Sequence, residues 1–192
     1  MISFKNVCYS YGTKNIIKDF SLDVATGSVL CLTGKSGSGK TTLLKLAAGI
    51  LKAESGTVIA PQKISYVFQE DRLLPHISVM QNLLFVAGKE KAGICNDLLE
   101  KSGLAQFSNV MPEKLSGGEK RRVAILRAVA YSGDALLLDE PFNGLDLENK
   151  LNMVKIIKEN FVLKNKPVLM VSHNFEDASL LNAQTVEVIR KL

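Results

Sequence analysis

Apolar residues along the chain fall into short runs that predict β-strands. Residues 29–33, 135–138 and 168–171 are almost continuously apolar, which is typical of parallel strands that are buried on both faces. Residues 2–7 and 20–24 partly alternate apolar and polar positions, as expected of a sheet with one face in water. The chain is therefore expected to contain both kinds of sheet.

Helical spacing of apolar residues marks the segments between the strands. Residues 42–51 are apolar nearly all round, so this helix is expected to be buried. A further strand is predicted at 63–68. Beyond it the composition changes, and helical patches occur at 78–87 and at 89–102, with Gly103 as a C-terminal cap. These features predict an α/β protein with a helical subdomain inserted between two core strands.

Composition limits the function only loosely. The 192 residues are 46% hydrophobic and 22% charged, as in an ordinary soluble globular protein with a sizeable core. No apolar run approaches the roughly 20 residues of a membrane span, and Met1 leads straight into strand-like sequence, so no signal peptide is expected. Three cysteines without C-x-x-C spacing argue against a disulfide framework or a zinc site and favour a reducing cytosol. The net charge of +5 permits binding to nucleotides, nucleic acid or anionic lipid and identifies none of them.

A glycine-rich loop joins an apolar strand to the first buried helix. Residues 34–41 read GKSGSGKT and match the phosphate-loop pattern G-x-x-x-x-G-K-[ST]. Glycines let consecutive N–H groups line one concavity, and the helix N-terminus adds partial positive charge, so the loop suits phosphate oxygens. Lys40 can reach the outer phosphates and the Thr41 hydroxyl can ligate Mg²⁺, whereas Lys35 fills a free position. A glycine turn without a ligand is the alternative, which the filled pattern and its context disfavour.

A second pair of glycines opens another predicted helix. Residues 115–119 read LSGGE, and Ser116 and Glu119 match a capping box. The two glycines between them cost about 1 kcal/mol each relative to alanine in a helix interior. Bare backbone at a helix N-terminus suits an anion, although a capping box that happens to contain glycines remains the alternative. The cations at 120–122 are predicted to form a solvated face.

Polar residues follow the ends of three predicted core strands. Asp139 and Glu140 follow one strand, Gln69 another and His173 a third. Carboxylates at the end of a buried strand are costly unless they meet a cation or a proton. Successive side chains point to opposite faces, so Asp139 suits Mg²⁺ binding and Glu140 suits positioning of an attacking water. Taken one at a time, the two carboxylates could belong to an exposed acidic turn and the histidine could be structural. Ligands of parallel α/β sheets, however, bind beyond the carboxyl ends of the strands, where the phosphate loop is also expected.

An aromatic residue near the N-terminus has two interpretations. Tyr11 belongs to a predicted turn at residues 9–12. It either packs on the sheet or stacks on a flat ligand such as adenine, and periodicity supports both interpretations equally.

Taken together, these segments resemble the nucleotide-binding subunit of an ABC transporter over almost the whole chain, with LSGGE as the most specific motif. The resemblance implies a RecA-like P-loop NTPase core, a small antiparallel β subdomain and an inserted helical subdomain. All three would form a single ABC ATPase domain over residues 1–192. The β subdomain and core would cover about 1–70 and 132–192, and the helical subdomain about 71–131.

The resemblance also implies a role for each motif residue. Glu140 would be the catalytic glutamate, His173 the switch histidine and Gln69 the sensor of Mg²⁺ and water. Thr41, Gln69 and Asp139 would hold Mg²⁺. ATP would bind to Tyr11, Gly34, Lys35, Ser36, Gly37, Ser38, Gly39, Lys40, Thr41 and Thr42. The γ-phosphate held by a second copy would bind to Ser116, Gly117, Gly118 and Glu119, and residues 143–146 would cross the dimer interface. Glu119 departs from the family, which usually has glutamine there.

The implied function is an ATPase subunit that pairs, as a homodimer or with another ABC ATPase subunit, around two ATP molecules and Mg²⁺. It would drive a separate transmembrane permease from the cytoplasmic face of the membrane, with no nucleic acid expected. Separate ATPase chains are more typical of prokaryotic importers in this family. The rivals are a soluble ABC-type ATPase of DNA repair or translation and a regulatory module that does not hydrolyse ATP. The chain has no heptad run and no internal repeat, which disfavours the first, and its complete set of motif residues disfavours the second.

Overall fold

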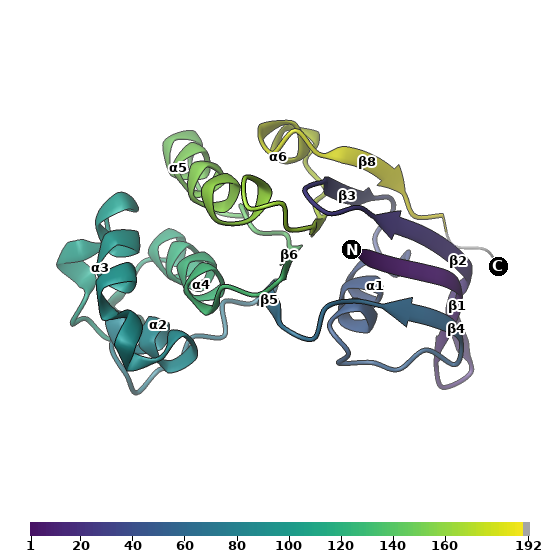
Figure 1. Cartoon of the computed structure of the whole chain (residues 1–192), viewed down its shortest axis with the longest axis horizontal. Helices are drawn as coiled ribbons and strands as arrows, with labels where there is room; N and C mark the ends of the chain where they lie inside the picture. Colours follow the sequence, from purple (N-terminus) through teal and green to yellow (C-terminus); the bar gives the residue numbers. More distant parts are fainter. Residues whose placement is uncertain (190–192) are drawn as a thin grey trace.

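The computed structural model describes residues 1–189 as two β-sheets with a group of helices at one end (Figure 1). The strands are β1 (Ile2–Tyr11), β2 (Lys14–Val24), β3 (Val29–Thr33), β4 (Ser55–Ile59), β5 (Ile64–Val67), β6 (Ala135–Asp139), β7 (Val168–Val171) and β8 (Gln184–Glu187). The α-helices are α1 (Lys40–Ala47), α2 (Val79–Ala87), α3 (Ala92–Lys101), α4 (Gly117–Tyr131), α5 (Leu147–Ile157) and α6 (Phe175–Leu180). Short 3₁₀ turns are η1 (Lys89–Lys91), η2 (Ala105–Phe107) and η3 (Pro112–Lys114), and the π-helical η4 (Lys158–Val162) extends α5.

The larger sheet is parallel and has the strand order β5-β6-β7-β3-β8. Its side chains alternate between two cores. Leu30 and Leu137 pack on the side of α1 and the smaller sheet, whereas Cys31 and Leu138 pack on the side of α4 and α5. Burial on both faces explains why these strands are continuous apolar runs, as predicted.

The smaller sheet is antiparallel and has the order β2-β1-β4. The predicted turn at residues 9–12 is wrong for residues 9–11, because β1 continues to Tyr11, which pairs with Lys14 across a tight turn that begins at Gly12. Shifts of register along the β1–β2 pair break the alternation that would have revealed the strands' full length. Strand β4 was missed altogether, since four of its five residues are exposed and it has no apolar period.

Helix α1 lies between the two sheets and contacts β4, β6 and β7 (Figure 1). It is buried as predicted, with Leu43 and Leu44 fully covered. It ends at Ala47 rather than at residue 51, because Gly49 adopts a left-handed conformation (φ 69°) that breaks the helix. A helix held on two sides is a rigid support for the loop that precedes it.

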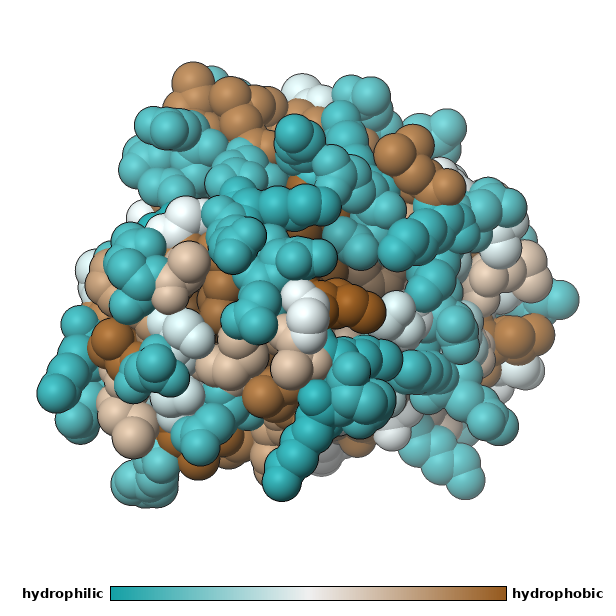
Figure 2. Space-filling view, turned by 60° about the vertical axis from the view of Figure 1, so that its left-hand side comes forward, coloured by the Kyte–Doolittle hydropathy of each residue, from teal (hydrophilic) through white to brown (hydrophobic). Residues whose placement is uncertain are grey.

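The helices at the far end of the molecule lie between β5 and β6 in the sequence, as expected of an inserted segment (Figure 1). Helix α2 begins with a capping box between Ser78 and Gln81. The buried amide of Asn82 exchanges hydrogen bonds with both backbone groups of Leu74 and fixes the preceding loop to α2. The surface on this side is mostly hydrophilic, with separate apolar patches (Figure 2). Within residues 1–189, no helix has the length and apolar character of a membrane span.

Burial in the core between the helices and the larger sheet leads to a prediction about the free energy of unfolding. Leu126 on α4 is fully buried, whereas Leu163 is 78% exposed. Leu126→Ala should lower the free energy of unfolding by about 2–5 kcal/mol, because it removes buried methyl groups and leaves a cavity. The matched control Leu163→Ala should change it by less than about 0.5 kcal/mol. Urea unfolding followed by circular dichroism measures both, and equal losses in the two variants would contradict the assigned core.

Candidate functional site

Four strand ends meet at one cavity. Strands β3, β7, β6 and β5 are successive neighbours in the parallel sheet, so their carboxyl ends open side by side. The phosphate loop follows β3, His173 follows β7, Glu140 follows β6 and Gln69 follows β5. Gln69, Glu140 and His173 line a cavity of about 360 Å³, together with Asp139 at the end of β6. The loop contributes Ser36, Gly37 and residues 39–42 to the lining, whereas Gly34, Lys35 and Ser38 do not line it. The structure therefore brings the predicted strand-end residues together.

The phosphate loop needs glycine at two positions. Gly34 and Gly39 have positive φ angles of 128° and 102°, which L side chains rarely adopt. A Cβ at Gly34 would lie 2.7 Å from the carbonyl oxygen of Val188, and one at Gly39 would lie 2.4 Å from a methyl group of Ile17. The loop thus leaves its backbone bare because its conformation and its close neighbours both require it.

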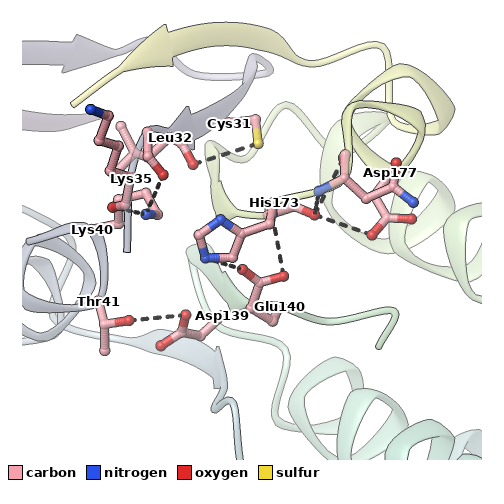
Figure 3. Close-up of polar contacts among 12 residues, drawn as sticks. Cys31, Leu32, Lys35, Lys40, Thr41, Asp139, Glu140, His173 and Asp177 are labelled. Carbon is pink, nitrogen blue, oxygen red and sulfur yellow. Dashed lines mark hydrogen bonds and ion pairs between the residues drawn. The ribbon is translucent and has the colours of Figure 1, made fainter. Parts of the chain in front are cut away.

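Lys40 is folded back over the loop (Figure 3). Its Nζ donates hydrogen bonds to the carbonyl oxygens of Gly34 at 2.8 Å and Lys35 at 3.0 Å, and only 5% of the residue is exposed. Burial lowers the pKa of this amine, and the carboxylates Glu140 and Asp139 oppose that shift. The side chain therefore places a cation on the cavity wall.

The oxygen atoms near Thr41 fit a hard divalent cation. The Thr41 hydroxyl donates to Oδ1 of Asp139 at 3.2 Å (Figure 3). Gln69 lines the same cavity. Burial raises the pKa of Asp139, and the hydrogen bond from Thr41 and the nearby cations oppose that shift. No group of three or more His, Cys, Asp or Glu residues within 1–189 could hold a metal by itself. This arrangement suits Mg²⁺, which commonly takes one or two carboxylates and completes its shell with water and phosphate oxygens.

Glu140 is buried in a strained conformation beside His173. Its φ of 49° is unusual for a residue other than glycine and costs about 1–3 kcal/mol, which the surroundings must offset. Oε2 accepts a hydrogen bond from the backbone N–H of His173 at 3.4 Å (Figure 3). Nε2 of the half-exposed imidazole lies 3.4 Å from Oε1, which is buried without a hydrogen bond. Burial raises the pKa of Glu140 and a charge on His173 lowers it, so the carboxylate is moved toward the range useful for accepting a proton.

Tyr11 stands at the cavity rather than in the core. It is 46% exposed, lines the cavity and meets Tyr9 edge-on with ring centroids 5.0 Å apart. Its position favours the second of the two interpretations, contact with a flat ligand. Lys14 and Ile16 line the same side of the cavity and were not predicted from the sequence.

The LSGGE segment lies apart from this cavity. The capping box is confirmed, since Ser116 Oγ accepts from the backbone N–H of Glu119 and the Glu119 carboxylate accepts from Ser116 N at 2.7 Å. None of residues 116–119 lines the cavity in this chain. A Cβ on Gly117 would meet no atom within 4 Å, so packing inside the chain does not explain the glycine.

The predicted solvated face at residues 120–122 is wrong for Arg121. Its side chain is 4% exposed, and its guanidinium donates to backbone carbonyls beyond the ends of β5 and β6. Burial lowers its pKa. Arg121 shares the inner face of α4 with Ile125 and Ala128, and this i, i+4, i+7 spacing was the signal that could have revealed it.

The family model for ABC transporters matches residues 17–143. The chain is 34% identical over 206 residues to an ergothioneine transport ATP-binding protein of Helicobacter pylori, a match that covers 98% of this chain and 97% of that protein. It is 38% identical over 173 residues to an aliphatic sulfonates import ATP-binding protein of Nocardia farcinica, covering 90% of this chain and 70% of that protein.

A solved dimeric structure of an ATP-binding cassette in a post-hydrolysis state, bound to ADP and Pi, has a TM-score of 0.86 and 27% identity to this chain. That match covers 98% of this chain and 94% of the cassette. Since the family match spans the phosphate loop and Glu140 and the relatives align over nearly the whole chain, this protein belongs to the ABC transporter family, as one of its ATP-binding subunits.

Proposed function

We propose that this chain binds and hydrolyses MgATP as the ATPase subunit of an importer, in pairs, and drives a separate membrane permease. The observation that carries the proposal is the convergence of four strand ends on one cavity, with Lys40, Asp139, Glu140, Gln69 and His173 around it. The names of the relatives, a transport and an import ATP-binding protein, support the transport role over DNA repair or translation.

ATP would lie along the phosphate loop with its base toward Tyr11. The amine of Lys40 would exchange its bonds to the loop carbonyls for bonds to the outer phosphates. Thr41, Asp139 and Gln69 would hold Mg²⁺, which would supply positive charge to neutralise the charge that develops on the phosphates. The half-exposed ring of Tyr11 offers a face for adenine.

Glu140 would orient the attacking water. The water oxygen bonds to the γ-phosphorus, the bond from that phosphorus to the β–γ bridging oxygen breaks, and a proton of the water passes to the carboxylate. The raised pKa of Glu140 supports this role. Contact of His173 with both carboxylate oxygens would keep the group aimed at the γ-phosphate.

A second copy would complete each site. Open space at Gly117 and the exposed N-terminus of α4 suit a phosphate that approaches from outside the chain. A twofold pair places each LSGGE segment over the partner's nucleotide and gives two equal sites. The dimeric cassette that resembles this chain supports such pairing.

The permease would dock on an apolar groove beside the helical end. The groove has a volume of about 390 Å³ and includes Ile50, Tyr66, Val86 and Tyr131 in its lining. Phe85 on α2 is 72% exposed, a high value for a phenylalanine. A cytoplasmic segment of the permease with an apolar face would cover these side chains, and the subunit would then sit on the inner face of the membrane.

Replacement of Glu140 tests the catalytic role. Glu140→Gln should keep ATP affinity but lower turnover by about 10²–10⁴-fold, because the amide cannot accept the proton of the attacking water. Glu100→Gln, an exposed position on α3, is the matched control and should keep normal turnover. Phosphate release under saturating MgATP measures both, and near-normal turnover of Glu140→Gln would exclude the role.

The Glu140→Gln variant, which should hydrolyse ATP slowly, also tests pairing through the LSGGE segment. Glu140→Gln protein should be monomeric without nucleotide and dimeric with MgATP, since the γ-phosphate is gripped by both copies. Adding Ser116→Arg should prevent the dimer by filling the anion site. Light scattering decides this, with ADP as the control nucleotide. A doubly substituted protein that dimerises as readily as Glu140→Gln would refute the shared site.

Replacement of Phe85 tests the docking surface. Phe85→Asp places a charge in the apolar contact, so a polytopic membrane protein that co-purifies with the parent chain in mild detergent should be lost. The MgATPase activity of the isolated chain should stay within about twofold, because an exposed substitution far from the cavity perturbs the fold little. Recovery of the same membrane protein in equal amount would count against this docking surface, and recovery of a nucleic-acid complex instead would count against the importer assignment.

A further inference from the structure

Arg121 of α4 donates hydrogen bonds to three consecutive carbonyls, the last one of β6 and the two that follow it. Its Nε donates to the carbonyl oxygen of Pro141 at 2.9 Å, and NH2 donates to those of Asp139 at 2.8 Å and Glu140 at 2.5 Å. These carbonyls lie on both sides of the strained Glu140 backbone. Its positive φ persists only if its neighbours hold it, and Arg121 supplies three of the bonds that do so.

The same guanidinium also donates hydrogen bonds to the segment that contains Gln69. NH1 donates to the carbonyl oxygens of Phe68 at 2.6 Å and Gln69 at 3.3 Å, and it lies 3.2 Å from Oδ1 of Asp71. One side chain therefore joins the loop after β5 to the loop after β6. Both loops contribute residues to the cavity.

The shape and charge of an arginine side chain suit these contacts to two loops at once. A buried cation is costly, and the only carboxylate it pairs with in the described chain, that of Asp71, is partly exposed. A planar guanidinium has five N–H donors in a fixed fork, which can hold several carbonyls in one plane. Lysine has a single point of donation on a flexible stem and cannot bridge the two loops in the same way.

We propose that Arg121 is a positioning residue for ATP hydrolysis, holding Glu140 and Gln69 in fixed relation to each other and to α4. The inference rests on the proposed function, in which these two residues act on the attacking water. Because the N-terminus of α4 carries the LSGGE segment, a shift of that segment on contact with the partner's nucleotide is passed to the chain's own Glu140. The two nucleotide sites of a pair are thereby coupled through each chain's Arg121.

Substitutions at Arg121 should separate turnover from nucleotide binding. Arg121→Gln should lower kcat by on the order of 10²-fold, as expected when a catalytic group is misplaced by about 1 Å, and leave the ATP Kd within about threefold. The kcat of Arg121→Lys should lie between that of Arg121→Gln and that of the parent protein. Lys120→Gln removes a neighbouring charge that points about 100° away around the helix, and it should keep the parent kcat.

A double-mutant cycle then asks whether Arg121 acts through Glu140. In single-turnover assays, Arg121→Gln should lower the rate less than about threefold in the Glu140→Gln background, because the group that it positions is already gone. Equal loss in both backgrounds would overturn the inference, as would a folded Arg121→Gln protein with parental kcat. In either case the parent's hydrolysis and its sensitivity to Glu140→Gln would leave the proposed function standing.

Asp71 provides a second variant if the Arg121 proteins unfold. Asp71→Ala removes the carboxylate that anchors the guanidinium but leaves the guanidinium and its carbonyl partners in place. It should lower kcat by about threefold or more at unchanged ATP Kd. An Asp71→Ala protein with parental kcat, or one whose kcat and urea midpoint fall while its ATP Kd rises in proportion, would show that the cluster has only a structural role.

Discussion

Parallel hydrogen bonding between β5, β6, β7 and β3 forces four carboxyl ends onto one edge of the sheet. Strands β3, β6 and β7 are largely buried on both faces and almost wholly apolar, so their functional polar side chains lie where the strands end. Neighbouring strands lie about 4.8 Å apart, and this spacing sets the distances between groups at the cavity. Most of these groups are far apart in the sequence, and they are neighbours only while the parallel pairing holds.

Features that depend on a few adjacent residues could be predicted from the sequence. The phosphate loop needs only its glycines, its lysine and the strand and helix on either side. The capping box of α4 depends on residues three positions apart, Ser116 and Glu119. The strand-end positions of Glu140 and His173 followed from apolar runs alone, because continuous apolar character identifies a strand buried on both faces. Gln69 follows a more mixed run, residues 63–68, which was still predicted as a strand.

Features set by contacts between distant segments could not be predicted in the same way. Strand β4 is mostly exposed and is a strand because it pairs with β1, which its own residues do not indicate. The interpretation of Arg121 as a surface cation followed from its charged neighbours, whereas its burial is caused by loops more than fifteen residues away along the chain. The helical spacing from Ile125 places residue 121 on the buried face of α4. The charge of the arginine side chain led instead to the prediction of an exposed position.

The hydroxyl of Ser116 has a single proton to donate, and Oε2 of Glu119 already accepts it at 2.9 Å. A phosphate oxygen that approaches this hydroxyl must compete with the carboxylate, whose negative charge also repels it. Closure of the pair would then exchange one hydrogen bond for another instead of adding one, and the closed state would be correspondingly short-lived. In the proposed pair, a glutamate at this position would therefore favour rapid reopening over a long dwell in the closed state.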